Sequence, residues 1–215
     1  MLIVVSGASA GIGLAIAEKF LSEGHRVQGY DVSAPGVIDP AYEHFFHDVR
    51  SGEFPEGAEP EIVIVNAGTL DEAEAIDVNL LGAIRFAEHF KASERLKSVL
   101  FIASASARNG AEFPYYVASK AGLVGYMKNM ALQLAPRGVT VNSISPGGVK
   151  TPANAHILES EELYLRVLAE TLLNKWAEPE EVAELAYFLT VTNRSITGED
   201  ILMDNGEMLR SNFIW

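Results

Sequence analysis

The chain has 215 residues, and its 48% hydrophobic content excludes a disordered protein and suits one α/β domain. It has no cysteine, which excludes disulfides and thiolate metal sites. A formal net charge of -13 argues against binding to nucleic acid or to an anionic membrane surface. The longest early apolar run, Leu2–Val5, is too short for a membrane span or a signal peptide. We therefore expect a soluble, cytoplasmic protein.

Short β-branched runs alternate along the chain with segments of helical periodicity. In chain order the sequence predicts a strand at Leu2–Ser6, a helix at Gly11–Ser22, strands at Arg26–Asp31, His44–Asp48 and Glu61–Asn66, a helix at Glu72–Ser93, a strand at Ser98–Ser104, a helix at Tyr116–Ala135, a strand at Val139–Ile144, helices at Ser160–Leu173 and Glu178–Leu189, and a strand at Ile201–Asp204. This order predicts a parallel sheet with helices on both faces, in a single doubly wound, Rossmann-type α/β domain over residues 1–215. Ligands of such sheets bind at the carboxyl ends of the strands.

The first predicted strand runs into a glycine-rich turn, Ser6-Gly7-Ala8-Ser9-Ala10-Gly11-Ile12-Gly13. Gly7 allows a tight turn, Gly11 allows the backbone to approach a ligand, and Gly13 allows the next helix to pack close to the sheet. The free N–H groups at the start of that helix point at an anion, as a pyrophosphate site requires. The spacing G-x3-G-x-G differs from the G-x-G-x-x-G dinucleotide fingerprint, so a tight turn without a ligand is the alternative.

The second predicted strand ends at Asp31, about twenty residues after the glycine turn. A carboxylate at this place accepts hydrogen bonds from the adenosine ribose hydroxyls and repels a 2′-phosphate. Ala10, Val32 and Ser33 offer no positive charge for such a phosphate. The pattern therefore favours NAD(H) over NADP(H). The alternative is a solvated aspartate in a turn.

At Tyr116-Val117-Ala118-Ser119-Lys120 the chain resembles the short-chain dehydrogenase/reductase family. The resemblance runs nearly end to end and is specific because several weak motifs occur together in a fixed order. These are the glycine turn, Asp48-Val49, Asn66-Ala67-Gly68, Asn79 in Val-Asn-Leu-Leu-Gly, Ser104, Tyr116/Lys120, Pro146-Gly147-Gly148-Val149-Lys150-Thr151 and Ile196-Thr197-Gly198. The resemblance implies parallel strands in the order 3-2-1-4-5-6-7, and the interconversion of an alcohol and a carbonyl compound with NAD(H) and no metal.

By this resemblance Asp48 and Val49 lie against the adenine, and Val149 and Thr151 hold the carboxamide side of the nicotinamide. The expected cofactor-binding residues are Gly7, Ser9, Gly11, Ile12, Gly13, Asp31, Asp48, Val49, Asn66, Ala67, Gly68, Tyr116, Lys120, Pro146, Gly147, Val149 and Thr151. The expected catalytic residues are Asn79, Ser104, Tyr116 and Lys120.

The expected chemistry agrees with these residue types. Tyr116 and Lys120 are four residues apart, so they share one face of a helix. A free tyrosine has a pKa of about 10, and an adjacent ammonium favours the phenolate. Tyr116 can then exchange a proton with the substrate oxygen, which the hydroxyl of Ser104 can hold. Lys120 can also hold the ribose hydroxyls, and Asn79 can anchor a water that passes the proton on. Tyr115, which has no lysine four residues later, and Ser106 are the competing candidates.

Several further expectations concern the outer parts of the molecule. The segments between Asp48 and Asn66 and between Gly68 and Asn79 leave little room for full helices, so one sheet face should be thinly covered. Residues 152–175 should form a lid over the substrate. The resemblance implies a homodimer or homotetramer, packed through the helices that carry Asn79 and Tyr116. The apolar tail Phe213–Trp215 should pack across an interface or on its own subunit.

Two other functions use the same pattern. One is an epimerase or dehydratase that keeps the nucleotide bound, and the short segment after Thr151 argues against a large sugar-nucleotide domain. The other is a regulatory protein that binds NAD without catalysis, which would not need an acid/base pair such as Tyr116 and Lys120.

Overall fold

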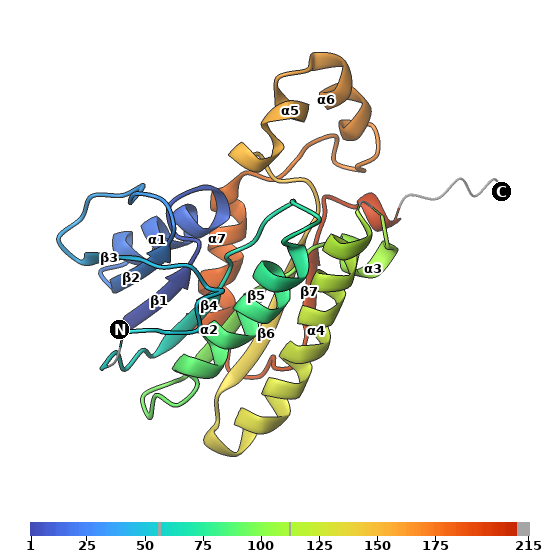
Figure 1. Ribbon diagram of the computed structural model, residues 1–215. Helices are drawn as coiled ribbons and strands as arrows, with labels where there is room; N and C mark the ends of the chain where they lie inside the picture. Colours follow the sequence, from blue (N-terminus) through green and yellow to red (C-terminus); the bar gives the residue numbers. More distant parts are fainter. Residues whose placement is uncertain (56, 112, 210–215) are drawn as a thin grey trace.

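A computed structural model describes residues 1–55, 57–111 and 113–209. One parallel sheet runs through it, with seven strands in the order β3-β2-β1-β4-β5-β6-β7 (Figure 1). The strands are β1 (Leu2–Ser6), β2 (Arg26–Asp31), β3 (Tyr42–Phe46), β4 (Ile62–Val65), β5 (Ser98–Ile102), β6 (Thr140–Pro146) and β7 (Asp200–Met203). All neighbouring strands pair in parallel. The predicted strand order and the doubly wound fold are confirmed.

Helices cover both faces of the sheet, with α1 and α7 on one side and α2 and α4 on the other (Figure 1). The α-helices are α1 (Gly11–Ser22), α2 (Ala83–Phe90), α3 (Ser106–Asn109), α4 (Pro114–Leu134), α5 (Ala155–Leu158), α6 (Glu161–Leu168) and α7 (Pro179–Tyr187). Two π-helical segments, Ile76–Gly82 and Phe188–Thr192, lead into α2 and follow α7, and single 3₁₀ turns occur at Ala135–Arg137, Pro152–Asn154 and Glu207–Leu209. In the described part of the chain no helix is long and apolar enough to cross a bilayer.

The central strands are apolar at nearly every position because both of their faces are covered. In β1, Ile3 and Val5 point into one core with Phe20 of α1, whereas Val4 points into the other core with Phe86 of α2. All five of these side chains are fully buried. Because the sheet holds the strand ends in register, it brings residues that are far apart in sequence to one carboxyl edge.

The described part of the segment between β3 and β4 contains no helix, as its length predicts. The ring of Phe54 takes the place of a helix on that face. Its centroid lies 4.3 Å from that of His47, 4.9 Å from that of His89 and 5.6 Å from that of Phe86. A cluster of aromatic rings therefore covers the part of the sheet that we expected to be thinly covered.

Several predicted boundaries were wrong. The predicted helix Glu72–Ser93 begins only at Ile76 and is π-helical as far as Gly82. The predicted helix Ser160–Leu173 ends at Leu168, and the backbone then turns back at Asn174, which has a φ of 51°. The predicted strand Ser98–Ser104 ends at Ile102, and the predicted strand His44–Asp48 lies two residues earlier, at Tyr42–Phe46. These ends depend on tertiary contacts: the N–H of Leu173, for example, donates to the carbonyl of Asn205 at 3.2 Å. The tail Phe213–Trp215 lies outside the described residues.

Candidate active site at the carboxyl edge of the sheet

A cleft of about 770 Å³ opens at the carboxyl ends of β1, β2, β4, β5 and β6. Sequence-predicted site residues contribute a large part of its wall: Gly7, Gly11, Ile12, Asp31, Asn66, Ala67, Gly68, Ser104, Tyr116, Lys120, Pro146, Gly147, Val149 and Thr151. Five predicted residues are not on the wall: Ser9, Gly13, Asp48, Val49 and Asn79. The predicted roles of all of them stay predictions, and the contacts below show what each residue does in the fold.

The glycine turn is closely packed, and its sterics require glycine. Gly7 has a φ of +68°, and a Cβ there would lie 2.8 Å from the Cα of Ala67. A Cβ on Gly13 would lie 2.0 Å from the carbonyl oxygen of Gly7, so α1 could not pack this close to the turn. The side-chain amide of Asn66 donates to the carbonyls of Ser6 and Gly7 at 3.1 and 3.0 Å. Asn66 therefore holds the turn in shape.

The start of α1 faces the cleft through Gly11 and Ile12. Its N-cap residue, Ala10, has no side chain that could accept from the first N–H groups of the helix. Gly11 has no side chain to block the backbone, and the first N–H groups of the helix have no side-chain cap. A diphosphate could therefore approach and accept hydrogen bonds from these N–H groups. A Cβ on Gly11 would lie 3.3 Å from Thr151 on the opposite wall, so the channel is narrow at this point.

Asp31 lies at the other end of the same channel. One of its carboxylate oxygens accepts from the N–H of Ser9 at 3.0 Å, and the other accepts from the N–H of Ser33 at 2.9 Å. Ser9 thus acts by holding Asp31 rather than by lining the cleft. Burial, together with the charge of Asp31, raises the pKa of Tyr42 to about 12. Among the described wall residues Lys120 is the only basic one, and it belongs to the opposite end of the cleft.

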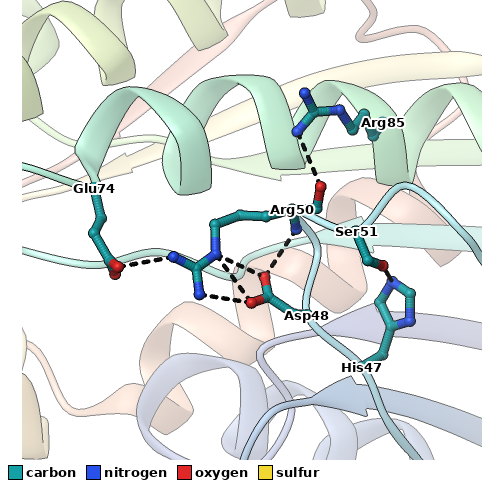
Figure 2. A network of polar contacts seen from close by, with 6 residues as sticks. All are labelled: His47, Asp48, Arg50, Ser51, Glu74 and Arg85. Atoms are coloured by element: carbon teal, nitrogen blue, oxygen red, sulfur yellow. Dashed lines mark hydrogen bonds and ion pairs between the residues drawn. The ribbon is translucent and has the colours of Figure 1, made fainter.

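Asp48 forms a salt bridge with Arg50 (Figure 2), and it is not among the residues that line the cleft. Its carboxylate accepts from Nε and Nη2 of Arg50 at 2.9 and 2.6 Å, and Arg50 also binds Glu74 at 2.7 Å. The guanidinium of Arg50 lowers the pKa of Asp48. Val49 is buried, with its Cγ2 2.7 Å from where a Cβ on Gly82 would stand. Neither residue lines the cleft, and their predicted adenine contacts stay predictions.

Tyr116, Lys120 and Ser104 meet at the end of the cleft where β5 and α4 approach one another. The ammonium of Lys120 is buried, donates to the carbonyl of Ile102 at 2.9 Å and lies 5.8 Å from the centre of the Tyr116 ring. A Cβ on Gly68 would make ordinary contact with this ammonium, at 3.5 Å, and a tighter contact, at 3.2 Å, with the amide oxygen of Asn79. The helical spacing of Tyr116 and Lys120 thus places both on the cleft wall.

The hydroxyl oxygen of Ser104 accepts two hydrogen bonds from one residue. The N–H of Ser106 donates to it at 3.2 Å, and the hydroxyl of Ser106 lies 2.9 Å away in donating position. With these bonds made, the proton of Ser104 is available for donation into the cleft. Ser106 is therefore a partner of Ser104 on the wall, whereas Tyr115 is 60% exposed and is not on the wall.

The side chain of Asn79 is fully buried in the π-helical segment, and its predicted catalytic role stays a prediction. Its oxygen accepts from the N–H of Thr69 at 2.7 Å, and its nitrogen donates to the carbonyl of Thr69 at 2.9 Å and to the hydroxyl of Ser119 at 3.3 Å. Both amide protons are therefore used within the protein, whereas the amide oxygen keeps a second lone pair. Ser119 in turn donates to the carbonyl of Tyr116 at 2.7 Å, so Asn79 ties the loop after β4 to α4.

Other wall residues escaped the sequence reasoning, because they lie in segments without a recognisable motif. They include Asn109, Asn154, Glu170, Trp176 and Glu207. The ring of Trp176 stands over Gly148, where a Cβ would come within 2.1 Å of it. Burial and the negative charges of Asp204 and Glu170 raise the pKa of Glu207. His156 is exposed and off the wall, and the described residues hold no group of three or more side chains suited to a metal.

The chain is similar in sequence to known reductases and dehydrogenases. The family described as enoyl-(acyl carrier protein) reductase matches residues 60–207. A 3-oxoacyl-[acyl-carrier-protein] reductase from Aquifex aeolicus is 30% identical, over 94% of this chain and 95% of the relative. An uncharacterized short-chain type dehydrogenase/reductase from Sinorhizobium fredii is also 30% identical, and 96% of this chain matches 43% of that longer protein.

Solved structures extend the likeness to the whole fold. The aldohexose dehydrogenase of Thermoplasma acidophilum, in ligand-free form, superposes with a TM-score of 0.89 at 27% identity, over 100% of this chain and 96% of that one. Two other similar structures hold NADP in one case and NADH in the other, so the likeness leaves the choice of nicotinamide cofactor open. Fold, motif order and curated relatives agree that the chain belongs to the short-chain dehydrogenase/reductase family.

Proposed function

We propose that the chain is an NAD(H)-dependent oxidoreductase that interconverts an alcohol and a carbonyl compound. One observation carries the proposal. A single cleft has a hydroxyl, a phenol and a buried ammonium at one end, from Ser104, Tyr116 and Lys120, and a glycine turn leading to Asp31 at the other. The two ends belong to the same cleft, so one elongated dinucleotide could extend from one to the other.

The residues at the catalytic end would manage the proton. Ser104 donates a hydrogen bond to the substrate oxygen, because its own acceptor positions are taken by Ser106. Tyr116 gives its phenolic proton to that oxygen during reduction and takes it back during oxidation. Lys120 stabilises the phenolate by its charge, and its ammonium is held in place by the carbonyl of Ile102. The nicotinamide, when bound, supplies or accepts the hydride.

The residues at the opposite end would select the cofactor. Each oxygen of Asp31 already accepts one backbone N–H, which fixes the carboxylate, and each keeps a lone pair for a ribose hydroxyl. Against a 2′-phosphate the same carboxylate is a like charge. Val32 beside it is 67% exposed and uncharged, so nothing at this position offsets the repulsion. These contacts support NAD(H) over NADP(H).

We further propose a lid over residues 152–175 and assembly into a homodimer or homotetramer. The lid includes α5 and α6, which stand above the carboxyl edge of the sheet (Figure 1), and Ile157 and Val167 face the cleft. Assembly through α4 has support from Leu132, which is 77% exposed. Leu123 and Met127 of the same helix are buried in the chain's own core. A cytoplasmic location stays a prediction.

An NADH-linked screen of aldehydes, ketones and alcohols tests this function. We expect oxidation of NADH with at least one carbonyl compound and reduction of NAD+ with the matching alcohol. Tyr116→Phe is the control, because it removes only the hydroxyl that transfers the proton. Binding of NADH without turnover of any compound would indicate a regulatory protein, and conversion of substrate without net change in NADH would indicate an epimerase or dehydratase.

A further inference from the structure

The first turn of α4 carries the phenol of the proposed reaction. The helix begins at Pro114, so Tyr116 is its third residue. The N–H groups of a first turn have no partner inside the helix, and helices fray at their ends. The residue before the helix, Phe113, has no side-chain group that could accept from them. A catalytic side chain at this position needs some other group to hold its backbone.

Glu72 supplies that group from a distant part of the chain. One of its carboxylate oxygens accepts from the N–H of Tyr115 and the other from the N–H of Tyr116, both at 3.1 Å. Pro114 has no N–H to satisfy, and the N–H of Val117 already donates to the carbonyl of Phe113 at 2.9 Å. One carboxylate therefore caps the two N–H groups that the start of α4 leaves open. Its negative charge also suits the positive end of the helix dipole.

The same contact fastens a second part of the cleft. Glu72 belongs to the loop after β4, in which Thr69, Leu70 and Asp71 line the wall. Asn79 holds the first residue of this loop through both the N–H and the carbonyl of Thr69. Glu72 holds its other side against α4. Glu72 itself is not on the wall, so its side chain does not line the cleft.

We propose that Glu72 is a positioning residue for the proposed reaction: its carboxylate holds the Tyr115–Tyr116 turn and, through it, the direction in which the phenol of Tyr116 points into the cleft. The inference rests on the proposed function, because it gives the contact a catalytic consequence. Loss of the carboxylate frees the turn to fray while the core of α4, which is buried at Leu123 and Met127, stays in place. The effect should therefore be on turnover and much less on cofactor binding or unfolding.

Two variants and a matched control test this. Glu72→Ala removes both acceptors, and Glu72→Gln keeps one oxygen, which can still accept from one of the two N–H groups. Glu74→Gln is the control, because Glu74 lies in the same loop but binds Arg50 instead. We expect Glu72→Ala to lower kcat at least tenfold with KM for NADH within twofold. Glu72→Gln should recover most of this loss, and Glu74→Gln should match the wild type.

Amide hydrogen exchange gives a readout that needs no substrate. In Glu72→Ala the amides of Tyr115 and Tyr116 should exchange at least tenfold faster, while that of Met127 keeps its wild-type rate. Unchanged kcat and unchanged exchange in Glu72→Ala would overturn the inference. So would a loss of kcat that comes with equal loss of NADH binding and uniformly faster exchange along α4. A wild-type chain that turned over no compound would instead refute the proposed function, and exchange at Tyr115 and Tyr116 would still decide whether Glu72 holds the turn.

Discussion

Cofactor choice should depend on the charge of Asp31. Two unit charges 4 Å apart interact by about 4 kcal/mol at an effective dielectric constant of 20, which sets the scale for its repulsion of a 2′-phosphate. The side chain is only half-buried at the rim of the cleft, so solvent and salt reduce this repulsion. We expect about 1.4 to 2.7 kcal/mol to remain, which is a tenfold to hundredfold preference for NADH over NADPH.

Two substitutions separate charge from shape at this position. Asp31→Asn removes the charge but keeps one oxygen for the N–H of Ser9 or Ser33, so it should lower the preference for NADH towards unity. Asp31→Ser combined with Val32→Arg should move it towards NADPH, because Val32 is exposed and an arginine there can reach a phosphate. Asp39→Asn is the control, since Asp39 binds the N–H of Ala41 and is not on the cleft wall.

The assay is the ratio of kcat/KM for NADH and NADPH with one accepted carbonyl substrate at fixed ionic strength. The melting temperature of each variant shows whether the substitution also disrupts the turn that Ser9 and Ser33 form with Asp31. Equal kcat/KM values for the two cofactors in the wild type, or better use of NADPH, would show that Asp31 does not read the ribose.

Four further outcomes are expected. Tyr116→Phe should keep less than a few per cent of wild-type turnover with nearly normal NADH binding; a higher rate would exclude the phenol as the proton donor. Lys120→Met should lower both turnover and NADH binding, because the ammonium has two roles, and an effect on only one would contradict this. Amides of residues 152–175 should exchange more slowly once the cofactor binds, and equal exchange rates with and without cofactor would refute the lid. Light scattering should give a dimer or tetramer at micromolar concentration, and a monomer would refute the predicted assembly.

The sequence alone was sufficient for the features that depend on local periodicity. Runs such as Leu2–Val5 are apolar at successive positions, which is typical of a strand covered on both faces. The glycines of the first turn predict a backbone that approaches its neighbours too closely for a side chain, and Gly13 shows such an approach. The four-residue spacing of Tyr116 and Lys120 places both on one helix face, and both line the cleft.

Only the tertiary structure decided which partner each polar side chain takes. Asp48 binds Arg50, two residues away, and does not line the cleft. The side-chain amide of Asn79 forms hydrogen bonds with Thr69 and Ser119. The carboxylate that caps α4 comes from Glu72, 43 residues before Tyr115. A carboxylate or an amide can bond with any donor of suitable geometry, so its partner depends on which segments the fold brings within about 3 Å. Periodicity along the chain does not contain that information, which depends on how the loop after β3 packs against the loop after β4, and that loop against α4.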